Sequence, residues 1–324
     1  MALPEIFKDM RLPLIAAPMF LVSGVELTVA ACRSGIAGTF PALNQRTTEG
    51  FEAWVVEIKE ELAKARADQP EVPVGPFGVN LIVHRSNPRV KADLQVCVDQ
   101  EVPLIITSLG AAKEVVDAVH GYGGVVFHDV TNRRHAQKAI EAGVDGIILV
   151  AGGAGGHAGQ TNPFALFNDI RPLFDGAIIL AGALSTGRDV AAARAMGADL
   201  AYMGTRFIAT RESRGQEAYK ELLCEARPED IIYTPAVSGV PANFIRQSLE
   251  QNDFDMDKLT DPAHVDFGEK LTVGDEAKAW KTVWSAGHGV SAIDDVPAVA
   301  ELVDRLDNEY RQACRRLADE LGDQ

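Results

Sequence analysis

The chain has 324 residues, with 31 Lys and Arg against 46 Asp and Glu, which gives a formal net charge of −15. This excess of acid argues against nucleic acid or an anionic membrane surface as a partner, because basic patches hold both. Hydrophobic residues make up 47% of the chain, which predicts a folded protein with a sizeable core. The length suits either two domains or one large α/β barrel with an insertion.

The N-terminal residues and the cysteines indicate a cellular compartment. Residues 1–11 mix charged and apolar residues and lack the apolar region of a signal peptide. No apolar run reaches the roughly 18 residues that a membrane span needs. Cys32, Cys97, Cys224 and Cys314 are far apart and form no CxxC pair, which favours reduced thiols over disulfides or a zinc site. We therefore predict a cytoplasmic protein without a metal centre.

Short apolar runs alternate with helical patterns up to about residue 210. The apolar runs are 12–19, 36–43, 77–83, 104–108, 124–130, 146–151, 177–181 and 200–204. Near-continuous apolar runs are typical of parallel strands buried on both faces. Helical patterns between them include 24–32, 48–67, 132–142 and 188–195. Eight such units predict an α/β protein of the (β/α)8 TIM-barrel class rather than an open sheet.

The alternation of apolar runs and helical patterns ends at about residue 210. Residues 211–226 resemble a charged helix, 231–240 form a short apolar stretch, and 244–281 are polar and irregular. A last amphipathic helix is predicted over 296–321. We expect residues 1–214 together with 284–324 to form the barrel, and the last helix to pack against it. Residues 215–283 would form a smaller, mostly helical cap domain over the barrel mouth.

The predicted strand ends carry the candidate site, because barrel enzymes place their chemistry at the carboxyl ends of the strands. The seventh and eighth predicted strands end at Gly182 and Gly204, where backbone N–H groups can approach an anion closely. Thr205 adds a hydroxyl donor. These glycines could also be simple strand-to-helix turns. Two such ends side by side favour a phosphate site.

A glycine-rich loop at residues 152–159 follows the sixth predicted strand, and His157 is its only functional side chain. A lone His is most often structural, but its place in this loop favours a general base, because a neutral imidazole near pH 7 accepts protons. The loop is not a Walker motif, since no Gly-Lys-Ser/Thr follows. Asn80 could hydrogen-bond a heterocycle. Strand alternation points only one of His128 and Asp129 into the barrel.

Six short motifs together resemble one known family. They are AAPM at 16–19, PFGVN at 76–80, AGGHAG at 154–159, AGA at 181–183, MGTRF at 203–207 and WSAG at 284–287. With them the chain resembles the nitronate monooxygenases, formerly called 2-nitropropane dioxygenases, which are FMN-dependent barrel enzymes. The resemblance implies His157 as the catalytic base. It implies FMN contacts at Ala17, Pro18, Met19, Asn80, Asp129, Val150, Gly155, Ala181, Gly182, Ala183, Gly204 and Thr205.

Two positions depart from the pattern of these relatives. Relatives often have a Lys where the fifth predicted strand ends in Asp129, and the resemblance therefore implies that a cationic contact to the flavin is missing here. The seventh strand ends in Ala-Gly-Ala rather than the more usual Ala-Gly-Gly. The turn must therefore tolerate the methyl group of Ala183.

The resemblance implies that O2 oxidises alkyl nitronates, and neutral nitroalkanes after proton removal by His157, to a carbonyl compound and nitrite. NADH:quinone reductases and one class of enoyl-acyl-carrier-protein reductase share these motifs, so a reaction with NAD(P)H stays open. A flavin-binding module without turnover and a phosphosugar barrel enzyme without flavin are further alternatives. A homo-oligomer is compatible with the sequence. Tyr233 and Phe244 are candidate walls of the pocket, and His288 could face it.

Overall fold

Eight parallel strands form a closed barrel at the centre of the protein. The computed structural model describes residues 3–84, 86–110, 113–237, 239–259 and 282–322. The barrel order is β1-β2-β3-β4-β5-β6-β8-β9, and β9 closes the ring by pairing with β1. The strands are β1 (Leu14–Ala16), β2 (Ala37–Pro41), β3 (Phe77–Ile82), β4 (Leu104–Ser108), β5 (Val125–Val130), β6 (Gly146–Val150), β8 (Ala177–Ala181) and β9 (Leu200–Met203). Each predicted apolar run contains one of them, so the predicted barrel is confirmed.

The strands alternate between an inner and an outer layer of side chains. Ile15, Phe127 and Ile179 belong to the cluster inside the barrel. Their chain neighbours, such as Val126 and Ile178, belong to the cluster between the strands and the helices. Because both faces are buried, each strand appears in the sequence as a continuous apolar run. Phe7, from a short N-terminal turn, stacks on Phe127 with the ring centres 5.2 Å apart and so fills part of the interior.

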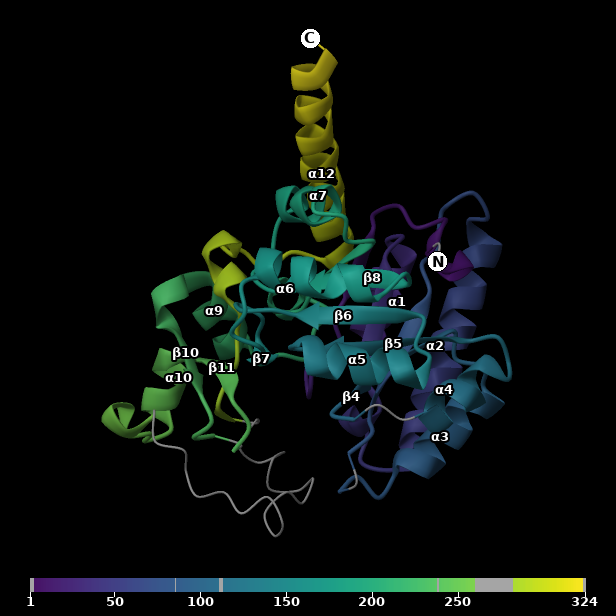
Figure 1. Cartoon of the computed structure of the whole chain (residues 1–324), viewed down its shortest axis with the longest axis horizontal. Coiled ribbons are helices and arrows are strands. Elements are labelled where there is room, and N and C mark those ends of the chain that lie inside the picture. Colours follow the sequence, from purple (N-terminus) through teal and green to yellow (C-terminus); the bar gives the residue numbers. More distant parts are fainter. Residues whose placement is uncertain (1–2, 85, 111–112, 238, 260–281, 323–324) are drawn as a thin grey trace.

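Helices surround the barrel, as Figure 1 shows. They are α1 (Val25–Arg33), α2 (Thr48–Asp68), α3 (Val90–Asp99), α4 (Lys113–His120), α5 (Arg133–Ala142), α6 (Pro163–Ile170), α7 (Gly187–Ala195) and α8 (Thr205–Ile208). Side chains cap several of their N-termini: Thr47 accepts a hydrogen bond from the Gly50 N–H at 3.0 Å, and Thr186 with Asp189 forms a capping box. Gly143 ends α5 in the left-handed region at φ 86°, which glycine adopts readily.

The chain after the barrel strands combines helices with a small sheet. It contains α9 (Glu217–Glu225), β10 (Ile231–Thr234), β11 (Ala242–Ile245) and α10 (Arg246–Gln251). The strands form a three-stranded sheet in the order β10-β11-β7, where β7 is the pair Gly156–His157. Residues 260–281 of the predicted cap lie outside the described residues. The division into a barrel and a cap domain stays a prediction.

The prediction of a helix over 211–226 was wrong for its first six residues. The Arg211 N–H donates to the Pro297 carbonyl, and the Arg214 N–H donates to the Val22 carbonyl. These long-range bonds hold residues 211–216 in turns and irregular backbone, so α9 begins only at Glu217.

The last helix, α12 (Val299–Gly322), packs on α7 and α1 through Leu302, Val303 and Leu306. Gly187 permits this packing, because a Cβ there would lie 2.0 Å from the Leu306 carbonyl oxygen. The later turns of α12 extend beyond the rest of the molecule. Across the described ranges, no helix has both the length and the apolar character needed to cross a bilayer.

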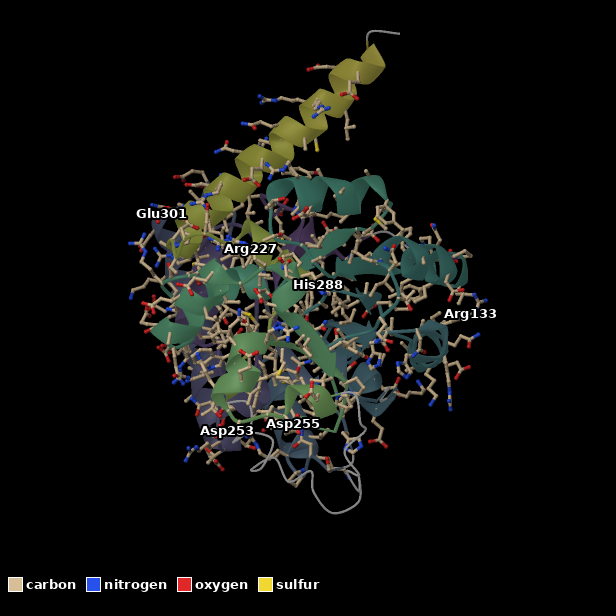
Figure 2. All side chains as sticks on the ribbon, turned by 90° about the vertical axis from the view of Figure 1, so that its left-hand side faces the viewer. Arg133, Arg227, Asp253, Asp255, His288 and Glu301 are labelled. Atoms are coloured by element: carbon tan, nitrogen blue, oxygen red, sulfur yellow. The ribbon has the colours of Figure 1, made fainter. Side chains whose placement is uncertain are left out.

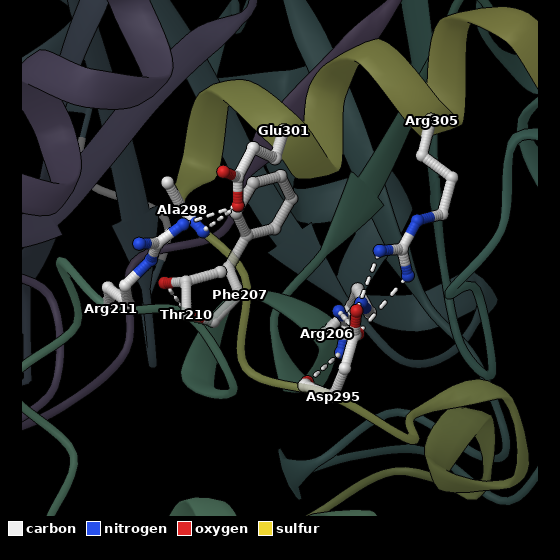
Figure 3. A network of polar contacts seen from close by, with 8 residues as sticks. All are labelled: Arg206, Phe207, Thr210, Arg211, Asp295, Ala298, Glu301 and Arg305. Carbon is white, nitrogen blue, oxygen red and sulfur yellow. Dashed lines mark hydrogen bonds and ion pairs between the residues drawn. The ribbon is translucent and has the colours of Figure 1, made fainter.

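A buried arginine ties the barrel to the segment before α12 (Figure 3). The Arg206 side chain is 2% exposed and donates to the Asp295 carboxylate at 2.7 Å and to the Asp295 carbonyl at 3.2 Å. The more exposed Arg305 binds the same carboxylate at 2.6 Å. Burial lowers the pKa of Arg206, and Asp295 opposes that shift. Asp295 is therefore the main compensation for this buried charge.

We expect Asp295→Ala to lower the free energy of unfolding by about 3 kcal/mol, because it leaves the Arg206 charge buried without its carboxylate. Arg305→Gln is the matched control. Because it removes only the exposed partner, it should cost less than about 1 kcal/mol. Urea unfolding of both variants measures the difference, and equal losses would contradict this assignment.

Candidate functional site

A cavity of about 1160 Å³ opens at the carboxyl ends of the barrel strands. All thirteen residues proposed from the sequence line it. They are Ala17, Pro18, Met19, Asn80, Asp129, Val150, Gly155, His157, Ala181, Gly182, Ala183, Gly204 and Thr205. The fold thus brings together residues that are up to 188 positions apart, from Ala17 to Thr205. Their individual roles remain predictions.

The backbone is closely packed at the β8 strand end and open at the β9 strand end. Gly182 has φ 129°, and a Cβ there would lie 3.0 Å from the Gly152 carbonyl oxygen. Ala183 follows with φ 57°, in the left-handed region. Its N–H donates to the Gly153 carbonyl at 3.1 Å, so this donor is already used within the protein. At Gly204 a Cβ would find only ordinary contacts at 3.7 Å. Gly204 therefore leaves room for a ligand.

His157 is held by a strand pair rather than by a free loop. It forms β7 with Gly156, and the register pairs His157 with Ala242 and Gly156 with Asn243. The Asn243 side-chain amide donates to the Ala154 carbonyl at 2.7 Å. Tyr233 donates through its hydroxyl to the Ala158 carbonyl at 3.2 Å. The segment after the barrel strands therefore fixes the loop that carries the predicted base.

Burial lowers the pKa of His157 to about 4. Its imidazole is therefore neutral near pH 7, and a neutral imidazole can accept a proton. The shift has one physical cause, because the charged form would lose its hydration. The geometry thus supplies a half-buried, neutral proton acceptor that lines the cavity.

The backbone at Gly287 closes the glycine-rich loop from the other side. A Cβ on Gly287 would lie 2.4 Å from the Gly153 carbonyl oxygen. The Gly287 N–H donates to the Thr205 hydroxyl oxygen at 2.9 Å, and the His288 N–H donates to the Gly153 carbonyl at 2.9 Å. The WSAG motif at 284–287 thus ends in a glycine because two backbones meet there.

His288 itself is not among the residues that line the cavity, although Gly287 and Gly289 are. The expectation that it could face the site is not met. Figure 2 shows His288 near the middle of the face that carries the small sheet, whereas the charged Arg133 and Glu301 lie at the edge of the same view.

A hydrogen-bonded chain of polar side chains crosses three strand ends. The Asn80 amide donates to the Ser108 hydroxyl oxygen at 2.7 Å, and the Ser108 hydroxyl donates to Asp129 Oδ2 at 2.6 Å. Burial raises the pKa of Asp129 to about 6. Its Oδ1 is buried and has no hydrogen-bond partner among the described residues. The chain therefore ends on a carboxyl oxygen whose partner would have to be a ligand, a water or a proton.

Asp129 and His128 fulfil the expected alternation. Asp129 follows Val125 and Phe127, which lie inside the barrel. His128 contacts the Thr107 hydroxyl on β4 at 2.7 Å through Nδ1, and burial lowers its pKa to about 4. Asp129 therefore lies on the interior side of β5, although His128 also borders the cavity.

Sequence reasoning missed several polar residues of the cavity, among them Ser108 and Tyr202. These two each lie two residues beyond an interior residue, Ile106 and Leu200 respectively. Strand alternation could therefore have identified both. Of the two candidate walls, Tyr233 lines the cavity. Phe244 is instead fully buried in a separate cluster with Leu249 and is not a lining residue.

The closed barrel, with the glycine turns at β8 and β9 and the cavity at its strand ends, defines a (β/α)8 barrel with an enzyme-like pocket. The chain belongs to the nitronate monooxygenase family, whose model matches residues 83–309. That family consists of flavin-dependent oxidoreductases.

Individual relatives agree with this placement. A nitronate monooxygenase of Paraburkholderia phytofirmans is 26% identical, over 94% of both chains. An indene-carboxyl-CoA dehydrogenase of Rhodococcus jostii is 27% identical over 73% of this chain, and the match covers 63% of that relative's length. The structure of a nitroalkane oxidase from Streptomyces ansochromogenes superposes with a TM-score of 0.80 at 22% identity, covering 96% of this chain and 99% of that one. This last likeness concerns the fold alone.

We expect Ala183→Gly to raise the free energy of unfolding by about 0.5–1 kcal/mol. A residue with a side chain loses about 1–2 kcal/mol in the left-handed region, and glycine avoids this cost. The greater conformational entropy of glycine in the unfolded chain cancels part of this stabilisation. Ala181→Gly, two residues earlier in β8, is the control. Ala181→Gly should destabilise the protein by about 1 kcal/mol, because it removes a buried methyl group and increases the conformational entropy of the unfolded chain, with no strain to relieve. Urea unfolding of the flavin-free protein distinguishes the two, and a loss in both variants would contradict the strain at Ala183.

Proposed function

We propose that this protein binds FMN and oxidises alkyl nitronates, and neutral nitroalkanes, with O2 to a carbonyl compound and nitrite. The observation that carries the proposal is the shared cavity, in which the neutral His157 faces the same space as the β8 and β9 glycine turns. A proton acceptor and an anion cradle in one pocket suit a nitroalkane and a phosphate-bearing cofactor.

The lining residues fit FMN. The turns at Gly182 and Gly204, with the Thr205 hydroxyl, would hold the phosphate. The backbone of residues 17–19 would lie beside the ring, and Asn80 would meet its polar edge. The buried Asp129 Oδ1 without a partner also points to a polar ligand atom at this place. When bound, the flavin supplies the electron transfer and the reaction with O2.

The protein's own contribution is to orient the substrate and to move its proton. His157 would accept the α-proton of a neutral nitroalkane, and with a nitronate it would hydrogen-bond the nitro group. The pairing of β7 with β11 keeps the imidazole in place during this step. We also propose that residues 215–283 act as a cap, since β10 and β11 lie against the His157 loop.

The free cysteine thiols are compatible with a cytoplasmic location, where thiols stay reduced. Cys32 and Cys97 are free and buried, and burial raises the pKa of Cys32 to about 12. Thiols with so little thiolate resist oxidation.

His157→Asn should keep the flavin bound and lose nitroalkane turnover by about 10²–10⁴-fold, because a positioned base contributes that much. Nitronates, which are already deprotonated, should lose far less. His135→Asn is the control, since His135 also lines the cavity but comes from the exposed start of α5. Steady-state kinetics with one nitroalkane and its nitronate give the comparison. Full nitroalkane activity in His157→Asn would refute the assignment.

The pH dependence follows from the lowered pKa of His157. The imidazole accepts a proton only in its neutral form, which prevails above about pH 4. We expect kcat/KM for a neutral nitroalkane to show no loss from His157 protonation between pH 6 and 8 and to fall as the pH approaches 4. In His157→Asn this acid limb should disappear. A limb that persists unchanged in the variant would assign it to another group.

A second candidate is an NAD(P)H-dependent reductase on the same barrel. It is favoured by the likeness to the Rhodococcus dehydrogenase and by Lys113 and Lys138, which line the outer part of the cavity and could meet a nucleotide phosphate. Anaerobic mixing with NADH decides between the two. Rapid bleaching of the flavin band near ~450 nm supports the reductase, and bleaching by an alkyl nitronate alone supports the monooxygenase. A steady-state comparison of propionate 3-nitronate, a simple alkyl nitronate and NADH with quinone then ranks the substrates. A colourless protein would exclude both candidates.

A further inference from the structure

The polar chain Asn80–Ser108–Asp129 begins on strands across the barrel from the proposed anion cradle and ends on β5. In the closed barrel order β1-β2-β3-β4-β5-β6-β8-β9, β3 lies four positions from β8 and β4 lies four positions from β9, whereas β5 is two positions from β8. A ligand anchored at Gly182 and Gly204 and extended across the mouth therefore reaches over the ends of β3, β4 and β5. These ends carry Asn80, Ser108 and Asp129, and all three line the same cavity.

Asp129 has little to compensate its charge. From β4 it receives the Ser108 hydrogen bond at 2.6 Å. From β6 it faces apolar side chains, because its register partner is Ile148 and Val150 lies beyond. From β9 it meets Tyr202, whose pKa is raised by burial and further by the Asp129 carboxylate.

Asp129 has no cationic partner among the residues that the structure describes. In the described part of the chain, no Lys, Arg or His forms an ion pair or hydrogen bond with Asp129. Lys113, His135 and Lys138, and the acidic Glu141, line the outer part of the cavity and come from α4 and α5. Asp129 thus brings an unpaired carboxylate to the floor of the site.

We propose that Asp129 sets the reduction potential of the bound flavin, by opposing the negative charge that the ring gains on reduction. Two-electron reduction with uptake of one proton leaves the ring with one negative charge. A carboxylate in a poorly hydrated pocket repels that charge more strongly than it would in water. Charged groups near the ring are among the features by which a protein tunes a flavin. The proposal rests on the proposed flavin site and adds to it the residue that controls its redox balance.

The effect must depend on pH. Burial raises the pKa of Asp129 to about 6, so the carboxyl is mostly neutral at pH 5 and mostly ionised at pH 8. The lowering of the potential should therefore be present at pH 8 and lost as the pH falls to 5. The Ser108 hydrogen bond favours the ionised form, so its removal should shift this transition to higher pH.

The test compares the flavin midpoint potentials of the wild type and Asp129→Asn, measured by anaerobic reduction against a reference dye. Asn has nearly the same shape and lacks the charge. At pH 8 and one fixed applied potential, we expect the ratio of reduced to oxidised flavin to be about tenfold higher in the variant. This corresponds to a potential about 30 mV higher for a two-electron couple. At pH 5 the two proteins should agree.

Ser108→Ala is the matched variant, because it keeps the charge and removes its hydrogen bond. We expect it to match the wild type at pH 8 and to reach the low-pH potential at a higher pH than the wild type does. This comparison also serves if Asp129→Asn fails to fold or to hold flavin. Equal potentials of the wild type and Asp129→Asn at pH 8, or identical pH dependence of the wild type and Ser108→Ala, would overturn the proposal. No substrate is needed, so a flavin-loaded protein with an unchanged potential refutes this role alone. A wild type that binds no flavin refutes the proposed function itself.

Discussion

The contact between three backbone segments at the barrel mouth is the constraint on which the site depends. The Gly153 carbonyl accepts hydrogen bonds from the Ala183 and His288 N–H groups, which come from the β8 end and from the segment before α12. A side chain on Gly287 would collide with that same carbonyl at 2.4 Å. One oxygen thus joins three parts of the chain that are distant in sequence. Gly287 leaves no space for a side chain there, and Gly153 has a φ of 90° that side-chain-bearing residues rarely adopt.

This contact explains why the site needs the chain beyond the barrel strands. The glycine-rich loop begins at the Gly153 junction and ends in β7, which has only two residues and cannot be stable alone. Pairing with β11 and the Asn243 bond to Ala154 complete its hydrogen bonding. The proposed base is therefore positioned by residues about 85 places later in the chain, Ala242 against His157. Changes in β11 should affect His157 even where they touch no ligand.

The barrel was predictable from the sequence because its strands are buried on both faces, which produces continuous apolar runs at regular intervals. The glycine turns and His157 were predictable because strand ends face the site in this fold. β7 and the start of α9 were not, because long-range bonds determine them: β7 exists only through β11, and residues 211–216 are held by Pro297 and Val22. Ser108 could have been predicted without a motif. The alternation of inward and outward side chains was applied to β5, where it selected Asp129, but it was not applied to the neighbouring strand β4.

The net charge of −15 excluded polyanions as partners but did not describe the pocket. Inside it, burial acts on two groups with opposite consequences. It lowers the pKa of His157 to about 4 and raises that of Asp129 to about 6. In both cases the ionised form is disfavoured, yet His157 stays neutral at pH 7, whereas Asp129 keeps a charge that can be removed by mild acid. An anionic nitronate and a reduced flavin would both be disfavoured by that charge. The Ser108 hydrogen bond therefore matters beyond local packing, because it helps to keep Asp129 ionised in the pH range where a cell operates.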